Sequence, residues 1–133
     1  MRKQNKKILV ALGIVVIVVA CVNFKSNNQD ISIPDFESKL WKGDSISCNG
    51  YRAKVADKLI ENKKVMQGKS KEDIERFLGS PNVEYSSYRY FIEKGVQCLG
   101  YVTKSGYDSL ETASIVIDFD DKNKVKDVGK IVP

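Results

Sequence analysis

The sequence predicts an α+β domain, a two-layer sandwich in which an N-terminal helical hairpin packs on a three- to four-stranded antiparallel sheet. Two segments ahead of Pro81 repeat their apolar residues with a helical period. After Pro81 the apolar residues alternate with polar ones, as strands require, and turn residues separate the alternating segments. The chain has 133 residues, which suits one domain with one core.

The best-defined element is a short helix between Gly68 and Pro81. Ser70 is placed to cap its first turn, and Asp73 is placed to complete a capping box. Gly79 and Pro81 end the helix, because glycine tolerates positive φ and proline cannot continue the hydrogen-bond ladder. One stripe is apolar, and the sequence predicts that it is buried: Ile74, Phe77 and Leu78.

The first helix of the hairpin is predicted from Tyr51 to about Asn62, with Ser47 or Asn49 as its N-cap. Its apolar residues recur with helical spacing: Val55, Ala56, Leu59 and Ile60. Trp41 lies ahead of this helix in a segment without clear periodicity. We expect it to be an apolar plug at the edge of the core, the alternative being a contact with a membrane or a partner.

Strands are predicted at 88–92, 96–102, 113–119 and 124–132. A turn at 93–95 would join the first two, and 104–109 reads as a loop. A tight turn at 120–123 joins the last two strands, with Asn123 able to take positive φ. The alternation of the last strand breaks near Gly129, where a β-bulge is expected.

The N-terminus has the pattern of a bacterial lipoprotein signal, predicted over residues 1–20. Four cations precede an apolar run of 15 residues, which is roughly 22 Å as a helix and too short for a roughly 30 Å hydrocarbon core. Val18–Cys21 then resembles a lipobox, which makes Cys21 the expected lipidated residue. The alternative is a signal anchor that happens to contain Cys21. Residues 21–34 read as the lipidated cysteine and a flexible tether, and 35–133 as the single folded domain.

Charge and composition exclude several functions. The formal net charge of +5 includes four charges that leave with the signal, so +5 − 4 gives about +1 for the mature chain, which argues against nucleic acid as a partner. The chain has no histidine, so histidine-based triads and histidine metal sites are excluded. The acidic cluster at 118–121 lacks the glycine of a calcium loop, because Lys122 follows it. Gly68–Ser70 lacks the earlier glycine of a phosphate-binding loop. We therefore predict no catalytic residue, no metal site and no cofactor.

If Cys21 carries lipid, Cys48 and Cys98 remain as a pair in an exported domain. A structural disulfide between the entrance of the first helix and the 96–102 strand is then expected, because the envelope is oxidising. Two buried free thiols are the alternative.

The motifs together resemble the small outer-membrane lipoproteins of the SmpA/OmlA (BamE) type. The resemblance rests on the capped acidic helix ending in Leu78-Gly79-Ser80-Pro81, the aromatic strand at 88–91, and an apolar strand ending in Phe119-Asp120 before a valine-rich last strand. It covers roughly residues 58–128. It implies a two-helix, three-strand layout and a periplasm-facing or surface-facing domain at the outer membrane.

The function expected from these observations is that of a non-enzymatic, lipid-anchored cell-envelope protein. It would act as a scaffold or accessory factor in an outer-membrane protein complex, with an envelope protein as partner and the membrane bound through the N-terminal lipid. The alternative is a periplasmic inhibitor-like or ligand-binding module that uses the sheet face. A small hydrolase is a third candidate, but the sequence shows no convergent titratable groups to support it.

Overall fold

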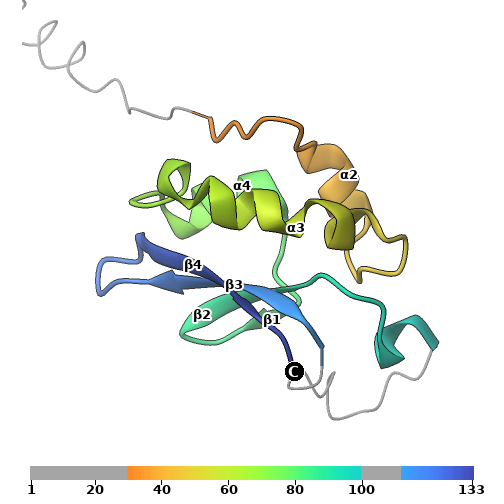
Figure 1. The fold of residues 1–133 in the computed structure, drawn as a ribbon. Coiled ribbons are helices and arrows are strands. Elements are labelled where there is room, and N and C mark those ends of the chain that lie inside the picture. The colour runs from red at the N-terminus through yellow and green to blue at the C-terminus, as the bar shows by residue number, and fades with distance from the viewer. Residues whose placement is uncertain (1–29, 100–111) are drawn as a thin grey trace, which may run out of the picture.

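The computed structural model describes residues 30–99 and 112–133, and within them the chain folds as helices on one face of an antiparallel sheet (Figure 1). This is the α+β, two-layer arrangement that the sequence predicts. The helix layer holds three α-helices in the described residues, one more than the predicted hairpin. The additional helix precedes the two that the sequence predicts. In chain order the elements are α2 (Ser38–Gly43), α3 (Tyr51–Glu61), the 3₁₀ turn η1 (Lys63–Val65), α4 (Lys71–Leu78), β1 (Val83–Glu84), β2 (Ser87–Phe91), the 3₁₀ turn η2 (Val96–Leu99), β3 (Ser114–Phe119) and β4 (Val125–Ile131).

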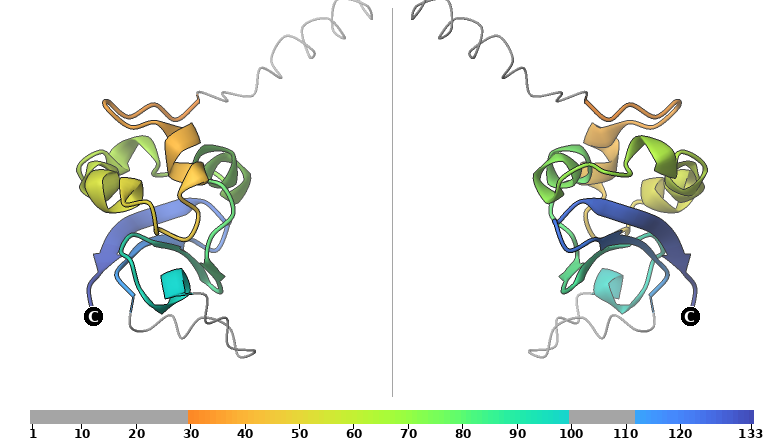
Figure 2. Two further views of the ribbon diagram at one scale, coloured as in Figure 1. Left: turned by 90° about the vertical axis from the view of Figure 1, so that its right-hand side faces the viewer. Right: turned by 90° about the vertical axis from the view of Figure 1, so that its left-hand side faces the viewer.

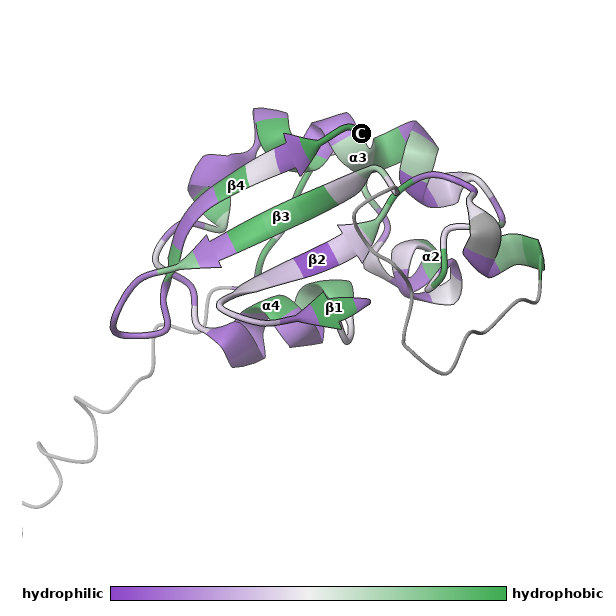
Figure 3. Cartoon of the chain, turned by 90° about the horizontal axis from the view of Figure 1, so that it is seen from below, coloured by the Kyte–Doolittle hydropathy of each residue, from purple (hydrophilic) through white to green (hydrophobic). Residues whose placement is uncertain are grey.

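The sheet is a meander with the strand order β1-β2-β3-β4, and each neighbouring pair is antiparallel. Viewed from the sheet side, β3 is the most continuously apolar strand and lies between β2 and β4 (Figure 3). Tyr88, Tyr90, Ile115 and Ile117 belong to the main core cluster, which also contains residues from the helices. Since side chains alternate along a strand, Phe91 and Val116 point to the opposite face.

The helix α4 forms as predicted. The Ser70 hydroxyl accepts a hydrogen bond from the Asp73 backbone N–H, and the Asp73 carboxylate accepts one from the Ser70 N–H, each at 3.2 Å. Ile74 and Leu78 are fully buried and Phe77 is half-buried. Gly79 has φ +78° and ψ −174°, a conformation that is open essentially to glycine alone. The boundaries are predictable because every group that sets them lies within four residues of a helix end.

Ser70→Ala is expected to lower the free energy of unfolding by about 1 kcal/mol, because one N–H of the first turn loses its acceptor. Urea unfolding followed by circular dichroism measures this loss. Ser80→Ala is the matched control, since Ser80 is exposed beyond the end of the helix. Equal midpoints for Ser70→Ala and the wild type would mean that water replaces the cap without cost.

The N-cap predicted for α3 is wrong. Gly50 occupies the cap position with φ +84° and offers no side chain, so neither Ser47 nor Asn49 caps the helix. The buried carboxylate of Asp44 takes over this role. It accepts hydrogen bonds from the backbone N–H groups of Asn49 at 2.8 Å and Arg52 at 3.0 Å. Asp44 lies eight residues before Arg52, outside the local window in which capping motifs are recognised.

Trp41 is not at the edge of the core but fully buried within it. It belongs to α2, a helix for which the sequence shows no period, and α2 contacts both α3 and α4. The ring centroid of Trp41 lies 5.5 Å from that of Phe36 and 6.2 Å from that of Tyr90. Trp41 therefore joins the helix layer to β2.

The strand predicted at 96–102 is also wrong in its described part. Residues 96–99 form the 3₁₀ turn η2, while 100–102, like the loop at 104–109, lie outside the described residues. The cause is that β3 pairs with all of β2, from Ser87↔Asp118 to Phe91↔Ser114, and so takes the neighbour position. The segment 93–95 accordingly leads into η2 and does not close a hairpin.

The β3–β4 hairpin follows the prediction except at its bulge. Asn123 has φ +56° in the turn, as expected. Gly129 pairs in register with Val116, so the predicted bulge is not at Gly129. The register shifts instead between Asp118 and Phe119, where the β4 partners step from Asp127 to Val125. Gly129 breaks the side-chain pattern because it has no side chain, but its backbone still pairs.

Candidate functional surface

The two cysteines of the folded domain form a disulfide, which confirms the predicted pair. The sulfurs of Cys48 and Cys98 are 2.05 Å apart, and the two Cα atoms 5.6 Å. The bond joins the α2–α3 loop to η2 rather than to a strand. Gln97 crosses the same junction, donating from Nε2 to the Ile46 carbonyl at 3.2 Å and to the Glu93 carbonyl at 2.9 Å. The disulfide and Gln97 thus fix η2 against the loop that precedes α3.

A buried arginine stands at the centre of the molecule, which the sequence analysis missed. Arg52 is 1% exposed, and its Nε donates to the Trp41 carbonyl at 3.1 Å. The guanidinium carbon lies 4.7 Å from the centroid of the Trp41 ring and 5.7 Å from that of Tyr90. Burial lowers the pKa of Arg52 to about 10, although Asp44 and Tyr90 act in the opposite direction. Arg52 is therefore still charged at neutral pH, held by carbonyl groups and aromatic faces.

Asn82 completes this centre. Its Oδ1 accepts from Arg52 Nη1 and from the Phe91 backbone N–H, each at 2.9 Å, and its Nδ2 donates to the Ser45 carbonyl at 2.7 Å. The α2–α3 loop, α3 and β2 are thereby tied together in one network. One sequence signal could have revealed it: Arg52 continues the apolar stripe of Val55 and Leu59, where a charged residue is unexpected.

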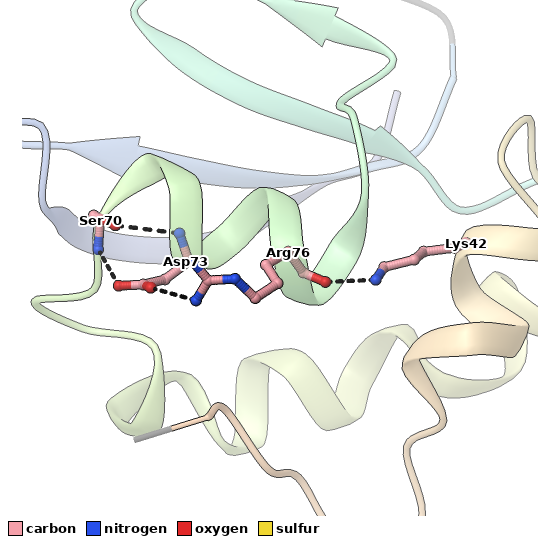
Figure 4. A network of polar contacts seen from close by, with 4 residues as sticks. All are labelled: Lys42, Ser70, Asp73 and Arg76. Atoms are coloured by element: carbon pink, nitrogen blue, oxygen red, sulfur yellow. Dashed lines mark hydrogen bonds and ion pairs between the residues drawn. The ribbon is translucent and has the colours of Figure 1, made fainter. Parts of the chain in front are cut away.

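The outer side of α4 carries a chain of polar contacts (Figure 4). Asp73 pairs with Arg76 at 3.1 Å, and Lys42 reaches from α2 to donate to the Arg76 carbonyl. Burial raises the pKa of the Asp73 carboxyl, but hydrogen bonds from Ser70 and the charge of Arg76 outweigh it, so the pKa is lowered overall. Asp73 is thus a charged capping group at neutral pH, unsuited to act as a base.

Two hollows flank the start of the described chain on this side. The smaller, about 160 Å³, is lined by Asp30, Ile31, Ser38, Asp73, Arg76 and Phe77. The larger, about 380 Å³, is lined by Asp30, Ile31, Ser32, Lys64, Val65, Gln67 and Lys69. In the smaller hollow, Asp73 and Arg76 are already paired with each other, and the Ser38 hydroxyl donates to the Phe77 carbonyl. Asp73, Arg76 and Ser38 thus hold α4 and α2 in place at this hollow.

Two tyrosines of β2 form hydrogen bonds that join the sheet to α4 and its C-terminal end. Tyr88 donates to a Glu75 carboxylate oxygen at 2.5 Å, and Tyr90 donates to the Gly79 carbonyl at 2.9 Å. Burial raises the pKa of both phenols, and the Glu75 hydrogen bond raises that of Tyr88 further. Both tyrosines remain protonated at neutral pH, in keeping with a structural role.

The far face of the sheet is not open at its centre. Phe91 and Ser114 are fully buried there and Val116 is 9% exposed, although none of the three belongs to the core cluster under the helices. The large exposed apolar side chains lie away from this centre, although one of them, Ile131, is on the same face at the edge strand β4, opposite Ser114. They are Leu40, Ile46, Val65, Tyr85, Leu99, Ile131 and Val132. In the described residues, large exposed apolar side chains are therefore absent from the middle of the sheet face.

The described residues contain no group of three or more acidic or cysteine side chains that could hold a metal ion. Residues 30–99 and 112–133 also include no helix long and apolar enough to cross a membrane. Cys21, the expected lipidation site, lies outside the described residues. Comparison of the chain with protein-family models, with curated proteins and with solved structures finds no match.

Proposed function

We propose that this chain is a non-enzymatic, lipid-anchored protein of the bacterial cell envelope that assists or scaffolds an outer-membrane protein complex. The disulfide between Cys48 and Cys98 is the observation that carries the proposal, because such bonds persist in oxidising compartments and are rare in the cytosol. The lipobox at Val18–Cys21 supplies the route to that compartment. The α+β fold is also of the class that the resemblance to BamE-type lipoproteins implies.

The chemistry of the described residues favours binding over catalysis. The carboxylates whose pKa is lowered serve local structure. Glu72 and Asp73 accept hydrogen bonds in the first turn of α4. Asp120 accepts from the turn N–H groups of Lys124 and Lys122, and Asp127 pairs with Lys63. A general base needs a pKa near the working pH, and these groups are shifted away from it. The domain therefore acts, in this proposal, through its surface.

Cys21→Ser is expected to abolish lipid labelling and release the protein from the membrane fraction. The physical reason is that the apolar run is too short to span a bilayer, so stable attachment needs the acyl chains. Cells fed a clickable palmitate provide the measurement. Ser80→Ala is the control, since Ser80 is exposed on the folded domain and its substitution leaves both the lipobox and the disulfide intact. Equal labelling of Cys21→Ser and the wild type would refute the lipoprotein assignment.

Crosslinking in intact cells tests the scaffold role. A photo-reactive residue at Tyr85, which is 78% exposed at the β1–β2 turn, or at Ile131, near the end of β4, should trap one specific outer-membrane protein. The edge strands β1 and β4 suit such contacts because an edge strand can pair with a strand of a partner. Ile131 is chosen at the end of β4 because Val125, at its start, already pairs with Gly68 and Lys69 through the backbone. Ala53, exposed on α3, is the control position. Identical crosslinked products from all three positions would mean that the contacts are non-specific, and would contradict the scaffold role.

A further inference from the structure

The place where the chain enters the domain is on the outer side of the helix layer. Residues 30–32 run over the helices, on the side away from the sheet, in every view (Figures 1 and 2). The same residues line hollows together with Lys64 and Arg76, which places them against the η1–α4 region. Ile33 is then buried in the core at 5% exposure and fixes this entry point.

The length of chain before this anchor limits how the domain can stand on a membrane. Twelve residue steps separate Cys21 from Ile33, and these span at most about 42 Å when fully extended. A domain of about 100 residues has a radius of gyration of about 13 Å, which corresponds to a sphere about 34 Å across and about 53 Å around half its circumference. A chain that starts on the helix layer therefore cannot wrap to the opposite pole of the domain.

The side chains around the entry point fit a lipid surface. Val65 is apolar and 41% exposed on the wall of the larger hollow. Its neighbour Lys64 has no ion-pair partner among the described residues, whereas Lys63 is paired with Asp127 at 2.8 Å. An apolar side chain beside a long cation suits the bilayer interface, where the apolar part enters the acyl boundary and the ammonium group meets phosphates. Asp30 also lines both hollows, so the proposed contact relies on Val65 and Lys64 and not on a broad positive field.

We propose that the outer side of the helix layer, at Lys64 and Val65, is the face that rests on the membrane, leaving the sheet and η2 turned away from it. This inference rests on the proposed lipidation of Cys21. It assigns the lipid bilayer as the occupant of the hollow beside Ile31. It also directs the exposed sheet edges, where a protein partner is expected, toward the side away from the lipid.

Quenching by brominated lipid tests the orientation. The full lipidated chain is bound to phosphatidylcholine vesicles with and without bromine on the acyl chains, and tryptophan fluorescence is compared. Val65→Trp places a reporter on the proposed face, and Leu99→Trp places a matched one on η2, where Leu99 is 68% exposed. The η2 segment lies on the opposite side of the molecule from residues 30–32 (Figure 1). The native Trp41 is fully buried and gives a constant background.

Val65→Trp should lose fluorescence in brominated vesicles, while Leu99→Trp should match the wild type. In the Val65→Trp chain, Lys64→Glu should reduce the loss and Lys94→Glu, at an exposed position between β2 and η2, should not. Equal quenching of the two reporters, or none in either while the protein is bound, would overturn the orientation. Cys21→Ser separates the two ideas: if the wild type binds vesicles no better than this variant, the lipid anchor itself is refuted and the orientation falls with it.

Discussion

Removal of the Cys48–Cys98 disulfide is expected to lower the free energy of unfolding by about 4 kcal/mol, because the bond closes a loop of 50 residues in the unfolded chain. Such a loss is of the same order as the whole stability of a small domain. The disulfide also stabilises the folded state directly, through the contact between η2 and the α2–α3 loop. The disulfide and the hydrogen bond from Gln97 to the Ile46 carbonyl hold η2 to the α2–α3 loop, so the double variant Cys48→Ala/Cys98→Ala also loosens that junction.

Urea unfolding of the double variant and of the wild type, with and without a reducing agent, measures this effect. The reductant should destabilise the wild type and leave the double variant unchanged, which separates the crosslink from the loss of the sulfur atoms. Gln97→Ala is a useful companion, because it weakens the same junction and keeps the covalent bond. A double variant as stable as the oxidised wild type would contradict the expectation.

Trp41→Ala is expected to cost about 3–5 kcal/mol, the range found when a fully buried large aromatic side chain is removed from a core. Trp41 packs against Phe36 and Tyr90 and offers its ring face to the guanidinium of Arg52. The substitution therefore leaves a cavity and also removes one of the groups that stabilise a buried charge. Loss of α2 from its place between α3 and α4 is the structural consequence that we expect.

Two variants make the test of Trp41 specific. Trp41→Phe keeps an aromatic face and should cost less than Trp41→Ala. It sacrifices no hydrogen bond, since Trp41 Nε1 has no acceptor among the described residues. Leu40→Ala, at the neighbouring position that is 46% exposed, should be nearly neutral. Thermal unfolding followed by circular dichroism ranks the three, and a Leu40→Ala variant as unstable as Trp41→Ala would show that α2 packs through a different side.

Locally encoded features could be read from the sequence. The helix α4 was predictable because Ser70, Asp73 and Gly79 set its ends through contacts a few residues apart. The β3–β4 hairpin was predictable because its alternating pattern and turn residues are contiguous, and Asn123 takes the positive φ expected of it. The disulfide pairing followed from counting, since two cysteines remain once Cys21 is assigned to the lipid.

Only the tertiary structure decided the features that depend on distant residues. The period of α2 is not visible in six residues, and the burial of Trp41 follows from Phe36, Arg52 and Tyr90, which belong to different parts of the chain. Asp44 replaces the expected cap of α3, because a buried carboxylate needs hydrogen-bond donors and the fold brings the N–H groups of Asn49 and Arg52 next to it. Val96–Leu99 could not add a strand between β2 and β3, because β3 had already satisfied the hydrogen bonds of that edge of β2. Which segment pairs with a given strand depends on all the segments that could pair with it. The residue pattern of one segment alone therefore does not predict its pairing.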